Sequence, residues 1–356
     1  MPNGIQMTNR QLDEQFMERA IELSRNGFPA RNPHVGCVLV RDGEIVGKGW
    51  HEFAGGPHAE ATALADAGTR SKGATAYVTL EPCNHQGRTP PCSEALIRSG
   101  VERVVYAVSD PNPKAMGGAA RLAESGINVE GGLLVEQASK VNWIWLNAME
   151  NRRPTVILKA AISLDGRIAT AAGHSKWITG LEARMEAHRL RAGCGAVLVG
   201  TRTAELDDPE LTVRHIEVRN QPVRFVIDRI RNLPDSLKIF NDRAPTVRIT
   251  ERPESESDLA GNWESGKLDL ANLCAHLFER GITGLLVEGG AATLSGFLTA
   301  KLADRIELFI APKILGSGPS WISFEGNSTV PEVPEWQVVK SKLVGQDLMV
   351  SLTPSA

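Results

Sequence analysis

Residues 79–92 read Thr79-Leu-Glu-Pro-Cys-Asn-His-Gln-Gly-Arg-Thr-Pro-Pro-Cys92, and His58-Ala59-Glu60 lies upstream of them. One imidazole and two thiolates form the soft nitrogen and sulfur set that suits Zn²⁺, and three protein ligands leave a fourth position for water. Glu60 lies two residues from His58 and can move protons between that water and a ring nitrogen or leaving amine. The stretch predicts a catalytic zinc site with His58, Cys83 and Cys92 as ligands and Glu60 as general acid and base.

The spacing of the cysteines leaves an alternative open. The motif H-x-E…P-C-x-x-C marks zinc nucleobase deaminases, whereas the second cysteine here follows nine residues after the first. A closed structural zinc site would need a fourth ligand, which His85 could supply. Cys92 is the first residue of a predicted helix at 92–99. The N-terminus of a helix favours the thiolate form of a cysteine, and a thiolate is the form that binds a metal.

Outward from this stretch, residues 1–150 alternate strands with short helices. Asp42-Gly43 joins two strand-like runs and is a strong hairpin signal. The predicted strands are Val35–Val40, Glu44–Trp50, Ala74–Leu80, Val101–Val108 and Ile127–Glu130, and the predicted helices are 10–26, 58–67, 92–99, 117–125 and 133–149. This order indicates a three-layer α/β domain with a mixed sheet. The polar segment 151–154 ends in proline and is a reasonable linker.

A second α/β series fills residues 151–356. Its predicted strands are Thr155–Ala161, Ala196–Gly200, Val223–Asp228, Thr246–Thr250, Gly284–Glu288 and Arg305–Pro312, its helices are 181–192, 269–280 and 291–301, and a hairpin over Gln337–Thr353 closes a sheet edge. The sequence has no G-x-G-x-x-G after a strand, so it does not support an ordinary Rossmann site. Gly289-Gly290 instead passes from a strand into a helix, where backbone N–H groups can approach a phosphate.

Composition excludes several classes of protein. A length of 356 residues suggests about two domains. A net charge of −3 does not fit a nucleic-acid or anionic-membrane binder. No apolar run approaches the roughly 18 residues that span a bilayer, and the N-terminus has no signal-peptide pattern, so we expect a cytoplasmic protein. Five cysteines are too few for a disulfide framework; Cys37, Cys194 and Cys274 are expected in the core.

Several motifs resemble the bifunctional riboflavin-biosynthesis deaminase–reductase family. In the first half they are residues 79–92, Asn32–Val38 and Asp110–Pro113. In the second half they are Leu158–Ala169, Ser175–Thr179, Val199–Arg214 and Ala311–Gly316. The motifs occur in the same order as in the family, and the resemblance of the two halves together extends over nearly the whole chain. One departure is Asn84, where the family usually has serine.

The resemblance implies a cytidine-deaminase-like α/β/α domain at 1–150 and a dihydrofolate-reductase-like α/β domain at 151–356. The first would bind zinc and deaminate 2,5-diamino-6-ribosylamino-4(3H)-pyrimidinone 5′-phosphate. The second would use NADPH to reduce the ribosyl chain of 5-amino-6-(5-phosphoribosylamino)uracil to ribityl. By position, Asn32, His51 and Arg88 would contact the deaminase substrate. A homo-oligomer, either a dimer or a tetramer, is also expected.

The resemblance also assigns residues of the second domain. The cofactor would contact Ala161, Trp177, Thr203, Asp207, Gly289, Gly290, Ala291, Ala292 and Thr293. The phosphoribosyl substrate would contact Lys159, Ser175, Arg191, Leu211, Arg214 and Glu288. Arginine forks suit a phosphate, and either Lys159 or Glu288 could supply the proton that accompanies hydride transfer. Our own hypothesis is that Arg229 contacts the 2′-phosphate of NADPH.

Two other functions remain open at this point. A nucleic-acid base deaminase with an accessory domain would share the zinc motif, although the near-neutral charge argues against it. A non-catalytic protein stabilised by zinc would keep the ligands but would not need Glu60. The leading expectation is an enzyme for a small phosphoribosyl pyrimidine, with no nucleic-acid or membrane partner.

Overall fold

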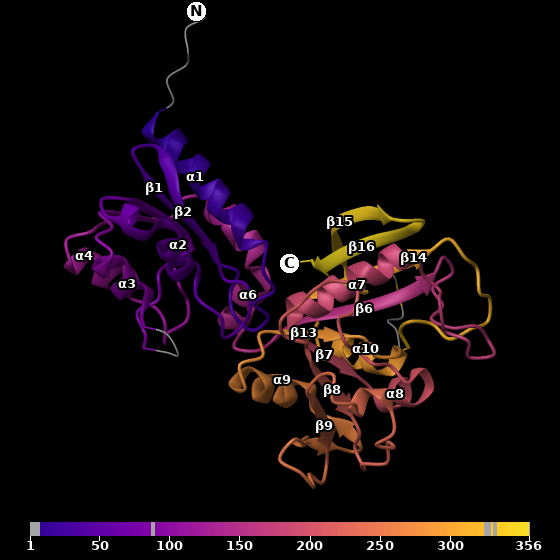
Figure 1. Cartoon of the computed structure of the whole chain (residues 1–356). Helices are drawn as coiled ribbons and strands as arrows, with labels where there is room; N and C mark the ends of the chain where they lie inside the picture. Colours follow the sequence, from indigo (N-terminus) through magenta and orange to yellow (C-terminus); the bar gives the residue numbers. More distant parts are fainter. Residues whose placement is uncertain (1–7, 87–89, 324–328, 330–332, 356) are drawn as a thin grey trace, which may run out of the picture. The chain divides into compact units, whose positions relative to one another are not determined.

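A computed structural model describes residues 8–86, 90–323, 329 and 333–355 of the chain. The chain divides into two compact units, Met1–Glu150 and Asn151–Ala356. Figure 1 colours the first unit indigo to magenta and the second magenta to yellow. Each unit is built around its own β-sheet.

The first unit contains a five-stranded sheet in the order β2-β1-β3-β4-β5. Its strands are β1 (Gly36–Arg41), β2 (Glu44–Trp50), β3 (Thr75–Leu80), β4 (Arg103–Val108) and β5 (Asn128–Gly131). The β1 strand pairs antiparallel with both β2 and β3, whereas β3, β4 and β5 run parallel. The sheet is therefore mixed, as expected, and the predicted β1–β2 hairpin is confirmed.

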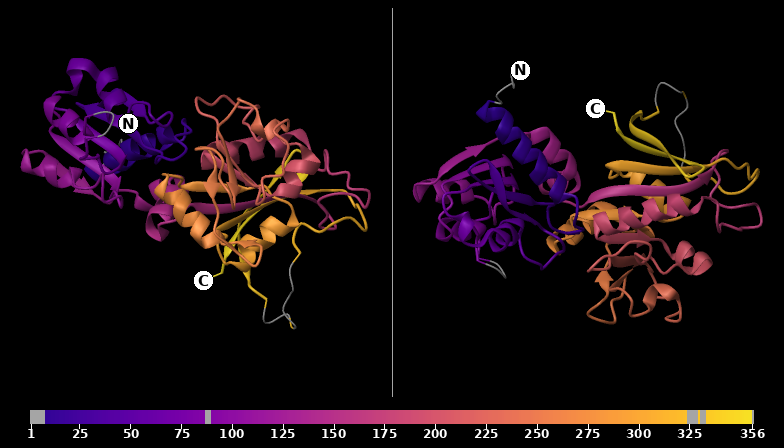
Figure 2. Two further views of the ribbon diagram at one scale, coloured as in Figure 1. Left: turned by 90° about the horizontal axis from the view of Figure 1, so that it is seen from below. Right: turned by 45° about the horizontal axis from the view of Figure 1, so that its top comes forward.

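Helices cover both faces of this sheet (Figure 2). On one face, α2 (Ala59–Ala67), α3 (Cys92–Arg98) and α4 (Gly118–Glu124) contribute to a core with Leu39, Val78 and Val104. On the other face, α1 (Asn9–Ser24) and α5 (Val135–Val141) pack against Val38, Tyr77 and Val105. The result is the expected three-layer α/β/α architecture.

Small residues bring α2 close to the sheet. A Cβ atom at Gly49 of β2 would lie 2.1 Å from the Ala59 carbonyl oxygen and 2.5 Å from the Ala63 nitrogen. A Cβ atom at Gly47 would lie 2.3 Å from the Ala63 carbonyl oxygen. Because these glycines have no side chain, the backbone of α2 lies directly on β2. This contact sets the position of His58 and Glu60 at the start of α2.

The prediction of one helix over 133–149 is wrong. The structure has two helices, α5 and α6 (Trp143–Asn151), which meet at Asn142. The Asn142 side chain is buried and pairs with the backbone of His34, accepting from its N–H at 2.7 Å and donating to its carbonyl at 2.8 Å. These side-chain bonds connect residues 108 apart in sequence, so a local pattern does not reveal them.

The second unit contains a nine-stranded sheet in the order β10-β9-β8-β7-β13-β6-β14-β16-β15. Its main strands are β6 (Thr155–Ser163), β7 (Ala196–Val199), β8 (Val223–Ile227), β9 (Thr246–Thr250), β13 (Gly284–Val287) and β14 (Arg305–Ala311). These strands run parallel. The hairpin of β15 (Trp336–Val344) and β16 (Asp347–Pro354) adds antiparallel to β14 and closes one edge, as predicted.

The sheet of the second unit has a core on each face. The helices α9 (Leu270–Glu279) and α10 (Ala291–Thr299) pack against one face around Leu277 and Phe297. On the other, α8 (Thr201–Asp207) packs through Ala204, and α7 (Leu181–Cys194) packs through Ala183. The α8 helix and the short strands β10 (Leu259–Ala260), β11 (Trp263–Glu264) and β12 (Lys267–Leu268) were not predicted.

Burial also tests the cysteine predictions. Cys37, Cys194 and Cys274 are buried among apolar side chains, so their assignment to the core is confirmed. The five cysteines are free thiols. Within the described part of the chain, no helix is both long enough and apolar enough to span a bilayer.

Candidate active sites

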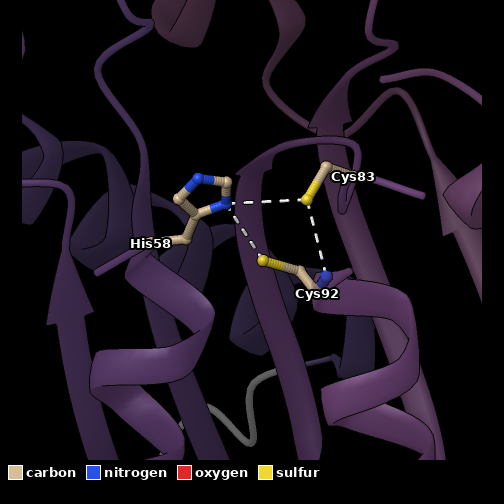
Figure 3. A group of neighbouring side chains, drawn as sticks. All are labelled: His58, Cys83 and Cys92. Carbon is tan, nitrogen blue, oxygen red and sulfur yellow. Dashed lines mark hydrogen bonds between the residues drawn. The ribbon is translucent and has the colours of Figure 1, made fainter. Parts of the chain in front are cut away.

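The residues predicted to bind zinc converge in the first unit (Figure 3). His58 immediately precedes α2, Cys83 follows β3, and Cys92 is the first residue of α3. The His58 Nδ1 atom lies 3.5 Å from the Cys83 Sγ atom and 3.3 Å from the Cys92 Sγ atom. The Cys92 backbone N–H donates to the Cys83 sulfur at 3.4 Å. Three segments of the chain thus place one nitrogen and two sulfurs together.

This donor set fits zinc. Zinc–ligand bonds of roughly 2.0–2.3 Å at tetrahedral angles separate ligand atoms by about 3.6 Å, close to the spacing here. Hydrogen bonds from Cys92 and His58 lower the pKa of Cys83 to about 4, which favours the thiolate. His85 does not belong to the metal-binding group found among the described residues. The closed site with His85 as a fourth ligand therefore lacks support.

Glu60 lies beside the cluster of His58, Cys83 and Cys92 but does not belong to the group of described side chains that could hold a metal. It is buried in the first turn of α2. Burial and then the neighbouring Cys83 raise the pKa of Glu60, and with the opposing effect of His58 included it lies at about 7. A carboxyl group whose pKa lies near neutrality can both accept and donate a proton, which is what a general acid and base must do.

Asn32 and His51 form a hydrogen-bonded pair next to His58. The His51 ring lies edge-on to the His58 ring, with centroids 5.4 Å apart. The His51 Nδ1 atom lies 2.8 Å from the Pro57 carbonyl oxygen, so Nδ1 carries the hydrogen and Nε2 is an acceptor. The Asn32 Nδ2 atom, 3.0 Å away, donates to Nε2. This orientation leaves the Asn32 amide oxygen available to accept a hydrogen bond.

Sequence reasoning missed Glu81, although it stands in the stretch that identified the site. Its buried carboxylate accepts three backbone hydrogen bonds from residues 110–119. Its position before Pro82 and Cys83 was a signal that could have identified it. Arg88, predicted to contact the substrate, lies outside the described residues.

A mostly buried triad of charged side chains lies in the second unit. Glu288, directly after β13, accepts from Arg191 of α7 at 2.5 Å through Oε1 and at 2.9 Å through Oε2. The Lys159 Nζ atom on β6 lies 3.5 Å from Glu288 Oε2. Burial opposes ionisation of Glu288, but the charges of Arg191 and Lys159 outweigh it and lower the pKa of Glu288 to about 2. Glu288 is therefore a carboxylate at neutral pH, and the fork of Arg191 is occupied by it.

The predicted phosphate-binding turn lies beside this triad. Gly289 and Gly290 connect β13 to α10, and the Gly290 N–H donates to Thr203 Oγ1 of α8 at 2.8 Å. A Cβ atom at Gly289 would lie 2.5 Å from Thr293 Cβ. Glycine at these positions lets the turn pack against the Thr293 and Thr203 side chains at the N-terminus of α10, where the helix dipole attracts an anion. Ala291 and Ala292 form the first turn of that helix.

Other predicted cofactor and substrate residues lie on several elements of the second unit. The Ser175 hydroxyl donates to Asp207 Oδ1 at 2.7 Å, joining one predicted substrate residue to one predicted cofactor residue. Ala161 lies two residues after Lys159 on β6 and so on the same side of the strand. Leu211 and Trp177 both have left-handed backbones, with φ of 54° and 63°.

The left-handed conformation of Trp177 is unusual for a bulky residue and is stabilised by neighbours. The Lys313 ammonium donates to the carbonyl oxygens of Trp177 and Ile178, at 2.9 Å and 2.7 Å. The Arg184 guanidinium stacks 4.0 Å from the centre of the Trp177 ring. The Trp177 side chain is 66% exposed, so a flat aromatic surface faces outward.

Arg214 and Arg229 carry exposed positive charge in this unit. The Arg214 side chain pairs with Glu210 at 3.0 Å, and its backbone N–H donates to His188 Nδ1 at 3.3 Å. Arg229 follows β8 and pairs with Glu251 at 2.7 Å. Its guanidinium lies 5.7 Å from the centre of the Trp263 ring. The sequence motifs did not indicate this aromatic contact.

Both units of the chain match known protein families. Residues 10–108 match the cytidine and deoxycytidylate deaminase zinc-binding region, and residues 154–350 match the RibD C-terminal domain. The riboflavin biosynthesis protein RibD of Aquifex aeolicus is 44% identical over 352 residues, covering 96% of this chain and 98% of that protein. RibD of Escherichia coli is 41% identical over 362 residues, covering 96% of this chain and 99% of that protein.

Solved structures agree over the full length. Form 1 of Acinetobacter baumannii RibD aligns with a TM-score of 0.89 at 38% identity, covering 98% of this chain and 100% of that one. The diaminohydroxyphosphoribosylaminopyrimidine deaminase/5-amino-6-(5-phosphoribosylamino)uracil reductase of Thermotoga maritima aligns with a TM-score of 0.87 at 37% identity, with the same coverage.

Fold and sites together define a zinc-binding deaminase of the cytidine deaminase type joined to an NADPH-utilising reductase with a dihydrofolate-reductase-like fold. The chain belongs to the RibD family of riboflavin biosynthesis proteins. It is accordingly a bifunctional deaminase and reductase of riboflavin biosynthesis.

Proposed function

We propose that this chain catalyses two consecutive reactions on a phosphoribosyl pyrimidine, with the deaminase in residues 1–150 and the reductase in 151–356. Hydrolysis would replace an exocyclic amine of the diaminopyrimidinone 5′-phosphate with oxygen and release ammonia. Reduction would then convert the ribosyl side chain of the aminouracil product to ribityl. The observation that carries the proposal is the presence of two separate sites in one chain, the His58–Cys83–Cys92 cluster and the Lys159–Glu288–Arg191 triad.

In the deaminase, His58, Cys83 and Cys92 would hold zinc, whose Lewis acidity activates water at neutral pH. The buried Glu60 carboxylate would take a proton from water and deliver protons to the ring nitrogen and to the departing amine. The Asn32 amide oxygen, left as an acceptor by the bond to His51, would bind an N–H group of the pyrimidine. Arg88 would supply a cation for the phosphate.

In the reductase, NADPH supplies hydride when bound. The turn Gly289–Gly290 with Ala291, Ala292 and Thr293 would hold its phosphates, because the α10 N-terminus favours an anion. Ala161, Trp177, Thr203 and Asp207 would hold the rest of the cofactor. Arg229 would contact the 2′-phosphate, since it stands at the end of β8 beside Trp263.

Lys159 is our choice for the proton donor in the reduction. Glu288 has a pKa of about 2, so at neutral pH it has no proton to give. Its carboxylate instead orients the Lys159 ammonium, which lies 3.5 Å away and carries donor hydrogens. Ser175, Leu211 and Arg214 would bind the phosphoribosyl group. Arg191, whose fork is bonded to Glu288, would act mainly by maintaining that carboxylate.

We also propose a homo-oligomer, either a dimer or a tetramer, acting in the cytoplasm. The edge strand β15 exposes Val338, Val339 and Leu343 to solvent, which favours association of chains along that edge. A site with two thiolate ligands favours a reducing compartment. Light scattering of the purified chain tests the oligomeric state.

A direct experiment tests the two activities. The purified chain is incubated with the diaminopyrimidine phosphate, with and without NADPH, while ammonia and NADPH oxidation are measured separately. We expect ammonia in both mixtures and NADPH oxidation that depends on prior deamination. If the chain releases no ammonia and oxidises no NADPH, the proposal is wrong. To test Arg229, NADPH and NADH are compared in Arg229→Ala, for which we expect a weaker preference for NADPH.

A further inference from the structure

Glu81 combines burial with an unusual set of partners. It follows β3 and precedes Pro82 and the ligand Cys83. The carboxylate forms no ion pair with any residue that the structure describes, although a buried carboxylate ordinarily needs compensation. Three backbone N–H groups take the place of a cation. Oε1 accepts from Gly117 at 3.2 Å and from Ala119 at 3.0 Å, and Oε2 accepts from Asp110 at 3.2 Å.

These bonds make Glu81 the N-terminal cap of a helix distant in sequence. The α4 helix begins at Gly118, and its N-cap residue Gly117 has no side chain to accept from the free N–H groups. Glu81 supplies that acceptor from β3, and its negative charge lies at the positive end of the helix dipole. A Cβ atom at Gly118 would lie 1.7 Å from the Pro82 carbonyl oxygen, so α4 starts directly against the residue before Cys83.

The segment held by Glu81 forms a wall of the zinc site. Ala115 packs with Cys83 and Cys92 in a buried cluster. The Ala115 carbonyl oxygen accepts from the Asn84 N–H at 2.9 Å. The Asn84 Oδ1 atom in turn accepts from the Ser93 hydroxyl at 2.9 Å, on the helix that carries Cys92. A continuous series of contacts therefore connects Glu81, through residues 110–117, with Cys83 and Cys92.

We propose that Glu81 is a positioning residue of the zinc site. By fixing residues 110–117 against Cys83 and Cys92, it holds the two sulfurs at the separation that the metal needs. Residues outside the immediate ligand set that orient ligands typically change metal affinity by about 10- to 100-fold when they are replaced. This inference rests on the proposed ligand set of His58, Cys83 and Cys92.

The test measures zinc affinity rather than turnover. Full-length wild type, Glu81→Ala and Glu81→Gln compete for zinc with a chromophoric chelator well below their unfolding temperatures. We expect about 10- to 100-fold weaker binding for Glu81→Ala. Glu81→Gln should lie between wild type and Glu81→Ala, because one oxygen can still accept from Gly117 and Ala119 while its amide group faces the Asp110 N–H.

Asp13→Asn is the matched control. Asp13 is a largely buried carboxylate of the same unit that bonds to Tyr77 and Arg103 on the α1 face, away from the zinc site. We expect it to lower thermal stability and to leave zinc affinity unchanged. In all three variants NADPH oxidation should stay at the wild-type rate when the aminouracil substrate is supplied.

The outcomes separate this inference from the proposed function. Wild-type zinc affinity in Glu81→Ala would overturn the positioning role, as would equal weakening in Glu81→Ala and Asp13→Asn. If Glu81→Ala does not fold, wild-type affinity in Glu81→Gln would overturn it. If the wild-type chain binds no zinc, the ligand set itself is wrong.

Discussion

Glu60 and Glu288 are two buried carboxyl groups of one chain whose pKa values move in opposite directions. Glu60 has no basic side chain bonded to it among the described residues, and burial raises its pKa to about 7. Glu288 lies between Arg191 and Lys159, whose charges lower its pKa to about 2. The first is suited to moving protons and the second to holding charge. Burial alone therefore does not decide what a carboxylate does, because its neighbours set the direction of the shift.

Replacing Glu60 and Glu288 by glutamine is the most direct test of the different roles of these two carboxyl groups. Glu60→Gln should reduce ammonia release by about 10³-fold, since the amide cannot accept or deliver the proton. Zinc content and NADPH oxidation with the aminouracil substrate should remain at wild-type levels. In the zinc-free protein, unfolding should be no easier than in wild type, because the change removes a buried ionisable group that has no basic side chain bonded to it among the described residues. Ammonia release within tenfold of wild type would exclude Glu60 as the general acid and base.

Glu288→Gln should behave differently. Removing one member of a buried ion pair leaves Arg191 and Lys159 uncompensated, and typically costs about 3 kcal/mol or more. We expect the second unit to unfold at lower denaturant concentration and NADPH oxidation to fall, while ammonia release is unchanged. Chemical denaturation followed separately for the two units measures the effect. Equal stability of Glu288→Gln and wild type would mean that the triad does not stabilise the fold.

The two units also differ in how closely other atoms pack against one glycine of each, Gly49 in the first unit and Gly193 in the second. In Gly49→Ala the new methyl group would lie 2.1 Å from a backbone oxygen of α2, which should destabilise the first unit by about 2 kcal/mol and displace His58 and Glu60. Gly193→Ala on α7 is the control, since nothing lies within 4 Å of the added atom. That change should stabilise the second unit by roughly 0.5–1 kcal/mol. Similar stability changes in both variants would refute the tight contact between β2 and α2.

The smallest expected effect concerns His188. Burial, followed by the charges of Arg191 and Arg214, lowers the pKa of His188 to about 4. In the unfolded chain the imidazole titrates near 6.5, so between pH 6.5 and 4 only the unfolded state gains the proton. The contribution of the neutral His188 imidazole to the free energy of unfolding is fully present above about pH 6.5, and it is lost as the pH falls toward 4.

In His188→Gln the free energy of unfolding should therefore depend less on pH below pH 7 than it does in wild type. Glutamine can still accept from the Arg214 N–H but does not titrate in this range. The free energy of unfolding of wild type should fall by about 1–2 kcal/mol more than that of the variant between pH 7 and pH 5. Parallel pH profiles for the two proteins would contradict the assignment.

The deaminase site could be predicted from sequence because its residues lie in short motifs. His58 and Glu60 are two residues apart, and Cys83 and Cys92 frame one stretch of chain. Metal chemistry restricts the residue types, so the pattern is specific. The reductase triad comes from β6, α7 and the residue after β13, so residue types alone could not show that the three side chains meet. Their selection depended on the resemblance to a family.

The sequence by itself indicated the His58, Cys83 and Cys92 cluster, the order of most helices and strands and the β1–β2 hairpin, because these depend on residue type and local periodicity. Tertiary structure alone decided features that rest on long-range contacts. The break between α5 and α6 depends on His34, and the cap on α4 depends on Glu81. The roles of Glu60 and Glu288 likewise depend on neighbours brought close by folding, since electrostatic shifts follow distance in space and not separation along the chain.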